Sequence, residues 1–175
     1  FNKSPLEQPR SIVKLDRIEL KRATGLYLDD AINTNVPGVI MQRRTQGAGQ
    51  QLVIRGYGNG MGNKGVTSNF DGQGTKTYLN GIPITDAEGV TVMDDIDFAS
   101  INSTEILKGP SGSLYGLAIA GVLNLKTEQA PKNKTSISQE VMAGSYGLLR
   151  STTKLSIGGE KSSLLVSYGR QQFDG

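Results

Sequence analysis

One stretch, residues 105–125 with the sequence EILKGPSGSLYGLAIAGVLNL, constrains the fold more than any other part of the chain. It opens with a short apolar strand, which Gly109-Pro110 interrupts. Proline lacks a backbone N–H and glycine tolerates positive φ, so this dipeptide enforces a turn. A second apolar run then ends at Leu125, and the glycines between the two runs indicate close approach of backbone segments. The stretch therefore predicts a core segment, but an irregular one.

Short elements are expected on either side of this stretch. Residues 11–21 have apolar side chains that suit one face of a helix, although part of the segment could be a strand. Residues 26–33 predict a short helix, which Pro37 ends because the residue before proline avoids the helical region. Residues 39–41 and 52–54 predict a hairpin, and Asn80-Gly81 predicts a tight turn.

Four blocks in sequence order resemble the plug domain of TonB-dependent outer-membrane receptors. Residues 105–125 match the family signature, and the other three blocks precede it in the family's order: Val36-Pro37-Gly38-Val39, Ile54-Arg55-Gly56 and Tyr78-Leu79-Asn80-Gly81-Ile82-Pro83. The tract over residues 59–97 particularly resembles receptors of Bacteroidetes-type bacteria. The resemblance implies an α+β plug domain over residues 1–128, with a small mixed sheet, short helices and long loops. Residues 97–101 resemble the short helix that leads into the signature strand of the family.

After Thr127 the pattern changes. Residues 129–175 contain three segments in which apolar and polar residues alternate, with turns between them. Alternating segments of about ten residues are typical of outer-membrane β-barrels, although an ordinary soluble meander gives the same pattern. After a plug signature, the resemblance favours the first antiparallel strands of a transmembrane β-barrel. Three strands cannot close a barrel and open edges do not occur in lipid, so we expect an N-terminal piece of a larger receptor.

Composition limits the chemistry that the chain can perform. It contains no cysteine and no histidine, which excludes disulfides and removes the commonest metal ligand and general base. The net charge of +3 is too small to indicate nucleic-acid binding. No apolar run is long enough for a transmembrane helix, and no signal peptide opens the chain. Acidic residues at 86–97 lack the spacing of a calcium loop. We therefore expect no enzyme activity, no cofactor, no metal site and no nucleic-acid partner.

A glycine-rich loop over residues 56–74 offers candidate ligand contacts. Gly60-x-Gly62-x-x-Gly65 matches a dinucleotide fingerprint only formally, because no helix follows it. Long loops without secondary structure are usually functional or disordered, and both interpretations stay open here. The resemblance implies an apical loop that faces the extracellular cavity. Its candidate substrate contacts are Tyr57, Asn59, Lys64, Asn69, Phe70, Asp71 and Gln73.

The resemblance also implies ionic contacts between plug and barrel through Arg55, Glu105 and Lys108. In the family these positions join a buried cluster with barrel carboxylates. Lys108 stands where the family has arginine, and lysine cannot make the bidentate fork of arginine, so its contact is expected to be looser. Glu105 and Lys108 are three positions apart on a strand and should face opposite sides. The residues alone leave open that Arg55 is a solvated surface charge.

The function implied by the resemblance is gating of energy-coupled ligand uptake across the outer membrane of a Gram-negative bacterium. A ferric siderophore is the favoured ligand, because the chain resembles compact siderophore receptors more than glycan importers. The implied partners are TonB with ExbB and ExbD, the chain's own C-terminal barrel, and outer-membrane lipid and lipopolysaccharide. A TonB box is expected upstream of Phe1. The alternative is an all-β extracellular carbohydrate-binding or adhesion module, which leaves the four ordered blocks unexplained.

Overall fold

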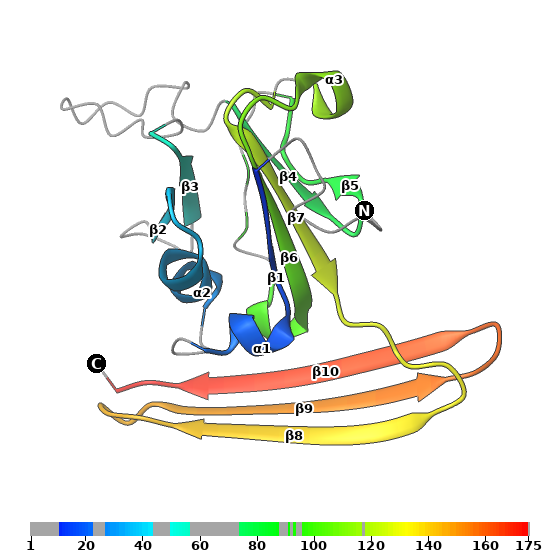
Figure 1. The fold of residues 1–175 in the computed structure, drawn as a ribbon. Coiled ribbons are helices and arrows are strands. Elements are labelled where there is room, and N and C mark those ends of the chain that lie inside the picture. Colours follow the sequence, from blue (N-terminus) through cyan, green and yellow to red (C-terminus); the bar gives the residue numbers. More distant parts are fainter. Residues whose placement is uncertain are drawn as a thin grey trace. The chain divides into compact units, whose positions relative to one another are not determined.

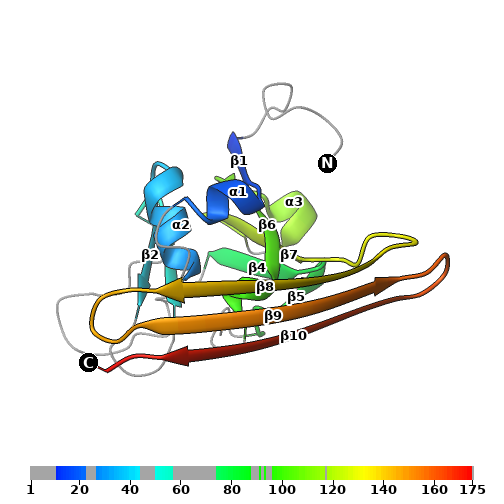
Figure 2. The same cartoon turned by 90° about the horizontal axis from the view of Figure 1, so that it is seen from below.

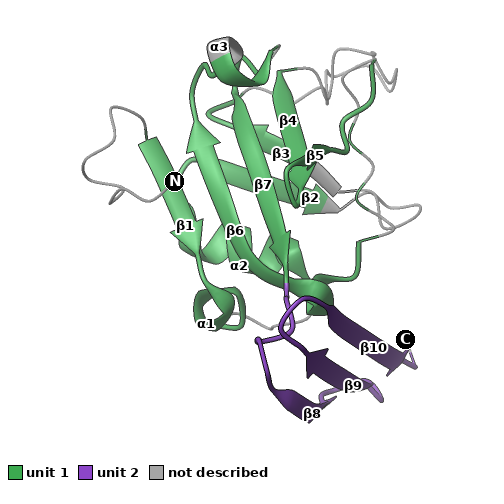
Figure 3. Cartoon of the chain, turned by 90° about the vertical axis from the view of Figure 1, so that its right-hand side faces the viewer, with its two compact units in different colours: residues 1–127 green, residues 128–175 purple. Residues whose placement is uncertain are grey.

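The computed structural model describes residues 11–22, 27–43, 50–56, 74–87, 91, 93, 96–116 and 118–174. The chain separates into two compact units, residues 1–127 and residues 128–175 (Figure 3). No helix within the described ranges is long and apolar enough to cross a membrane.

The first unit is built on a five-stranded mixed sheet (Figure 1). Its strands lie in the order β1-β6-β7-β4-β5, with β4 parallel to β7 and the other neighbours antiparallel. The bounds of the strands are Ser11–Leu15 for β1, Ile101–Lys108 for β6, Gly121–Thr127 for β7, Thr75–Leu79 for β4 and Ile82–Pro83 for β5. Because β1 is an edge strand, it pairs with β6 alone in this sheet.

Two helices and a hairpin pack with this sheet to form the main core. These elements are α1 (Arg17–Leu20), α2 (Leu28–Asn35), β2 (Val39–Arg43) and β3 (Gln50–Ile54), and β2 pairs with β3 in antiparallel register. The face of the sheet that they cover, here called the core face, contributes Ile106, Leu123 and Leu125, each fully buried. The opposite face, here called the outer face, holds a smaller apolar cluster around Leu107 and Val122.

The 105–125 stretch forms β6, β7 and the turn between them, which includes α3 (Gly112–Tyr115). Gly109 has φ +109, a conformation that L side chains rarely adopt, so the expected turn depends on glycine at this position. At Gly121 a Cβ atom would lie 2.2 Å from the Leu107 carbonyl oxygen and 2.8 Å from Ile54 Cδ1. The close approach of β6 and β7 therefore requires glycine, as the sequence indicates for this irregular core.

The shorter elements match most of the sequence expectations. Residues 11–21 divide into strand β1 and helix α1, because the first half pairs with the edge of β6. Asp16 begins α1 with a capping box: Glu19 N donates to Asp16 Oδ1 and Asp16 N donates to Glu19 Oε2, both at 2.9 Å. The predicted hairpin and the predicted turn are confirmed, with φ of +52 at Asn80 and +84 at Gly81. A 3₁₀ turn, η2, at Phe98–Ser100 precedes β6, as expected.

The second unit is an antiparallel meander in the order β10-β9-β8 (Figure 2). Its strands are β8 (Thr135–Ala143), β9 (Leu149–Gly158) and β10 (Ser163–Gln172). Ile137, Leu155 and Val166 lie side by side across the three strands, on the face that we call the apolar face. The alternate residues form the polar face.

The apolar face of this meander is exposed rather than packed into a core. On the apolar face, Ile137 is 75% exposed and Tyr168 is 70% exposed. On the polar face, Thr152, Lys154 and Ser156 of the central strand are buried, whereas the flanking strands are largely exposed. Large exposed apolar surfaces mark contacts with lipid or with other proteins.

Candidate functional site

All seven candidate substrate contacts in the glycine-rich loop lie outside the described residues. They therefore stay predictions from the sequence. The three predicted ionic residues, Arg55, Glu105 and Lys108, are described, and the structure places them in two different sites.

Arg55 and Lys108 meet at one corner of the first unit. Arg55 directly follows β3, and its backbone N donates to Gly38 O at 2.9 Å. Lys108 ends β6, and its Nζ donates to the neighbouring Pro37 O at 3.1 Å. Arg55 Nη1 lies 3.8 Å from the point that a Cβ on Gly109 would occupy, which places the guanidinium beside the residue after Lys108. We call this arrangement of Arg55 and Lys108 around Pro37–Gly38 the cationic corner.

The cationic corner has an unbalanced charge within the described part of the chain. Neither side chain forms an ion pair with a carboxylate there, and the Lys108 ammonium group donates to a neutral carbonyl. Arg55 is exposed and Lys108 is partly exposed. Two cations without a carboxylate of their own among the described residues make this corner suited to bind carboxylates.

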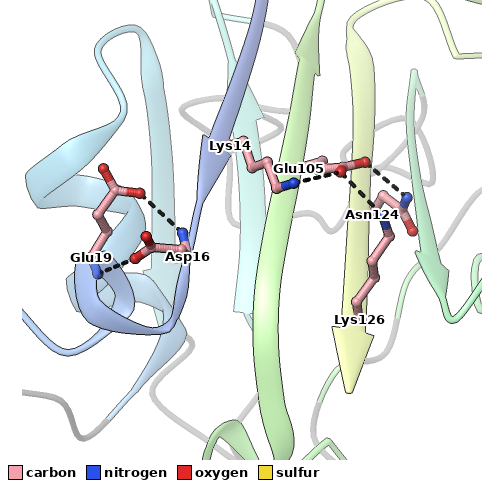
Figure 4. Close-up of polar contacts among 6 residues, drawn as sticks. All are labelled: Lys14, Asp16, Glu19, Glu105, Asn124 and Lys126. Atoms are coloured by element: carbon pink, nitrogen blue, oxygen red, sulfur yellow. Dashed lines mark hydrogen bonds and ion pairs between the residues drawn. The ribbon is translucent and has the colours of Figure 1, made fainter. Parts of the chain in front are cut away.

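Glu105 belongs to a separate site on the outer face, which we call the charged row: Lys14, Glu105, Asn124 and Lys126 (Figure 4). Its carboxylate is buried, with a side chain only 7% exposed. Lys126 Nζ lies 3.1 Å from Glu105 Oε1 and Lys14 Nζ lies 3.9 Å from the same oxygen. Asn124 Nδ2 donates to Glu105 Oε2 at 3.4 Å.

Strand register explains why these side chains meet. Lys14 of β1 is directly opposite Glu105 of β6, and Glu105 is directly opposite Asn124 of β7. Lys126 lies two residues further along β7 and therefore on the same face. The carboxylate loses hydration on burial, and the two ammonium groups offset that cost while remaining about half exposed themselves.

The structure thus brings Arg55 and Lys108 together and holds Glu105 apart from them. Glu105 and Lys108 face opposite sides of β6, as their spacing predicts. Sequence reasoning missed Lys14, Asn124 and Lys126. The alternation of side chains tells only which residues of one strand share a face. The pairing of β1 and β7 with β6 is needed to show that these three side chains lie on the same face as Glu105.

Comparison with known proteins gives consistent results. The family described as TonB-dependent Receptor Plug Domain matches residues 4–122. The vitamin B12 transporter BtuB of Vibrio vulnificus (strain CMCP6) is 27% identical over 139 residues, covering 78% of this chain and 21% of that relative. The hemin receptor of Yersinia enterocolitica is 30% identical over 132 residues, covering 73% of this chain and 17% of that relative.

Solved structures share the fold. The siderophore receptor PiuA from Acinetobacter baumannii superposes with a TM-score of 0.70 at 19% sequence identity, over 96% of this chain and 21% of that one. The chain spans about a fifth of the length of the curated relatives that it matches.

Proposed function

The chain belongs to the TonB-dependent receptor plug domain family, and from this premise we propose that the whole protein gates energy-coupled uptake of a ferric siderophore. Proteins of this family reside in the outer membrane of Gram-negative bacteria, and so does this one. The fold class predicted from the sequence is confirmed: an α+β plug is followed by the first antiparallel strands of a transmembrane β-barrel. We place the boundary between the two at residue 128.

One observation supports the transport proposal above all others. A plug-family domain is followed directly by a meander that exposes large apolar side chains on one face and carries mainly polar side chains on the other. Strands of outer-membrane barrels have this alternation, with apolar residues toward lipid and polar residues toward the lumen. A carbohydrate-binding module surrounded by water gains nothing from exposing Ile137, Val166 and Tyr168 together, so the alternative module is not favoured.

In the proposed mechanism the plug closes the barrel until the ligand binds from outside. TonB, energised by ExbB and ExbD, then pulls on the N-terminal side of the plug and displaces or partly unfolds it. Such a plug must be held by contacts that can break and re-form. Charged and polar contacts meet this requirement better than a large apolar interface, since water replaces them when they separate.

We assign the cationic corner to the contact between plug and barrel. Arg55 and Lys108 lie together without a carboxylate partner among the described residues, so acidic side chains of the unseen barrel wall are their proposed partners. Arg55→Glu and Lys108→Glu should each loosen the plug and raise the sensitivity of cells to large antibiotics. Lys161→Glu, in the exposed turn between β9 and β10, is the matched control and should not.

The ligand class is proposed on the relatives and on the chain's resemblance to compact siderophore receptors. The two curated relatives are named for vitamin B12 and hemin, both metal chelates, which favours a chelate over a glycan. The candidate contacts in the glycine-rich loop supply aromatic and polar groups for such a ligand.

An uptake experiment tests this proposal. Cells that produce the full-length receptor, with and without TonB, are offered catecholate and hydroxamate siderophores loaded with radioactive iron, and separately vitamin B12 and hemin. We expect uptake of a ferric siderophore that requires TonB. Uptake of vitamin B12 or hemin instead would correct the ligand and leave the transport proposal intact. Absence of any uptake that depends on TonB would contradict the transport proposal.

A further inference from the structure

The linker between the plug and the first barrel strand, residues 128–134, makes specific contacts with β9. It joins β7 to β8 and has no helix or strand of its own. The linker is the first part of the second unit and follows β7 directly in the chain, so its contacts decide whether it leaves with the plug or stays with the barrel strands.

The first contact is a short ion pair. Lys154 Nζ lies 2.7 Å from Glu128 Oε2, with the lysine side chain 7% exposed and the glutamate 27% exposed. Lys154 sits on the polar face of the middle strand, directly between Ser138 of β8 and Ser167 of β10. A buried ammonium group is costly unless an anion compensates it, and the first residue of the linker supplies that anion.

The second contact lies four residues further along β9, on the same face. At Gly158 a Cβ atom would lie 1.8 Å from the Pro131 carbonyl oxygen and 2.8 Å from the Pro131 carbonyl carbon. Gly158 N also donates to Lys134 O at 2.8 Å. The backbone of the linker therefore lies directly on the backbone of β9, and any side chain at position 158 would push it away.

The spacings of the two contacts agree to within about 3 Å. Positions 154 and 158 are about 13 Å apart along a strand, at roughly 3.3 Å per residue. Glu128 and Pro131 are three residues apart and can span about 10 Å when extended. The linker thus runs along β9 between the two contacts.

We propose that residues 128–134 are a tether that stays attached to β9 while the plug is displaced, with Glu128, Lys154 and Gly158 as its positioning residues. The inference rests on the proposed transport function. Glu128 follows Thr127, the last residue of β7, and β7 is hydrogen-bonded to strands on both sides. A pulling force applied at the N-terminus therefore acts on edge strand β1 first and on the tether last.

Pulling single full-length receptors in a lipid bilayer by the N-terminus tests the tether without any ligand. We expect the plug to extend first and the linker to be released afterwards, as a separate event of about 25 Å for its seven residues. In Glu128→Gln and Gly158→Ala the separate event should be lost, and the plug extension should lengthen by the same amount. Gly169→Ala is the matched control: it lies on the same polar face, where a Cβ would have ordinary contact at 3.7 Å with Thr152 Oγ1.

The outcomes separate this inference from the transport proposal. Release of the linker together with the plug in the unmodified receptor would overturn the tether, and so would unchanged traces in Glu128→Gln. Gly158→Ala could prevent assembly, and Glu128→Gln keeps the test decisive in that case because it retains the shape of the side chain. Failure of the transport proposal would appear instead as absence of uptake by the unmodified receptor.

Discussion

Replacing Lys126 by methionine removes the closer of the two cations that pair with Glu105 and leaves a buried carboxylate behind. The broken contact is a charged hydrogen bond of 3.1 Å. A hydrogen bond to a charged group contributes about 1.5–3 kcal/mol, and the partial exposure of Lys126 reduces that to about 1–2 kcal/mol. Lys14 is 3.9 Å away and 55% exposed, so Lys14→Met should cost less than about 0.5 kcal/mol.

Glu105→Gln should cost less than Lys126→Met, although it removes the centre of the charged row. It abolishes the buried charge, and both lysines remain accessible to water. The new amide can also donate to Asn124 Oδ1, which is buried and without a partner in the described part of the chain. In the Glu105→Gln background, Lys126→Met should add almost nothing, because no buried charge is left to uncover.

Hydrogen-exchange mass spectrometry of peptides from β6 and β7 in the full-length receptor measures these costs as local opening free energies. Lys126→Met should raise the opening equilibrium about tenfold, since about 1.4 kcal/mol corresponds to a factor of ten. Lys76→Met is the matched control on the outer face of β4. An equal loss of opening free energy in Lys14→Met and Lys126→Met would contradict the assignment of Lys126 as the stronger partner of Glu105. A loss in Lys126→Met no larger than that in Lys76→Met would contradict it too.

Three further substitutions test other parts of the structure. Gly121→Ala should destabilise the first unit by about 1–3 kcal/mol or more, because its Cβ would lie 2.2 Å from a backbone oxygen. This should appear as faster hydrogen exchange in β6 and β7, and exchange at the rate of the unmodified receptor would refute the close approach. Asn33→Ala should lower the local opening free energy of α2 and β2 by about 1–2 kcal/mol, read as faster hydrogen exchange, because the Asn33 side chain donates to Met41 O at 2.9 Å and accepts from Met41 N at 2.7 Å. Asn33→Asp keeps the acceptor and should lower this free energy by an intermediate amount; unchanged exchange in Asn33→Ala would contradict the role of these two hydrogen bonds. Ile137→Lys should lower the amount of receptor assembled in the membrane, because a lysine that faces lipid costs up to about 2–4 kcal/mol. Ser136→Lys on the polar face, opposite the uncharged Ser156, should not lower it; equal assembly of the two variants would contradict the assignment of faces.

Much of the fold could be predicted from the sequence because the informative signals are local. Gly109-Pro110 specifies its turn through backbone conformation, and the alternation in residues 135–172 fixes which side chains share a face. Residues 11–15 were ambiguous because the same apolar positions suit a helix or a strand, and pairing with β6 decides between them.

The candidate site was only partly predictable, because its contacts join distant segments. Arg55 and Lys108 could be proposed from the family pattern, and the structure adds that both contact the Pro37–Gly38 backbone. The partners of Glu105 depend on strand pairing, which no single segment encodes. The glycine-rich loop has no periodicity, so its candidate ligand contacts rest on residue type alone.

The electrical conductance of the full-length receptor in a planar lipid bilayer tests whether the first unit closes the barrel. We expect the intact receptor to conduct almost no current, because the plug fills the barrel. Removal of residues 1–127, with the tether and the strands kept, should give a large, stable pore. An intact receptor that conducts as well as the truncated one, or a truncated receptor that assembles without forming a pore, would contradict the claim that this unit is a plug.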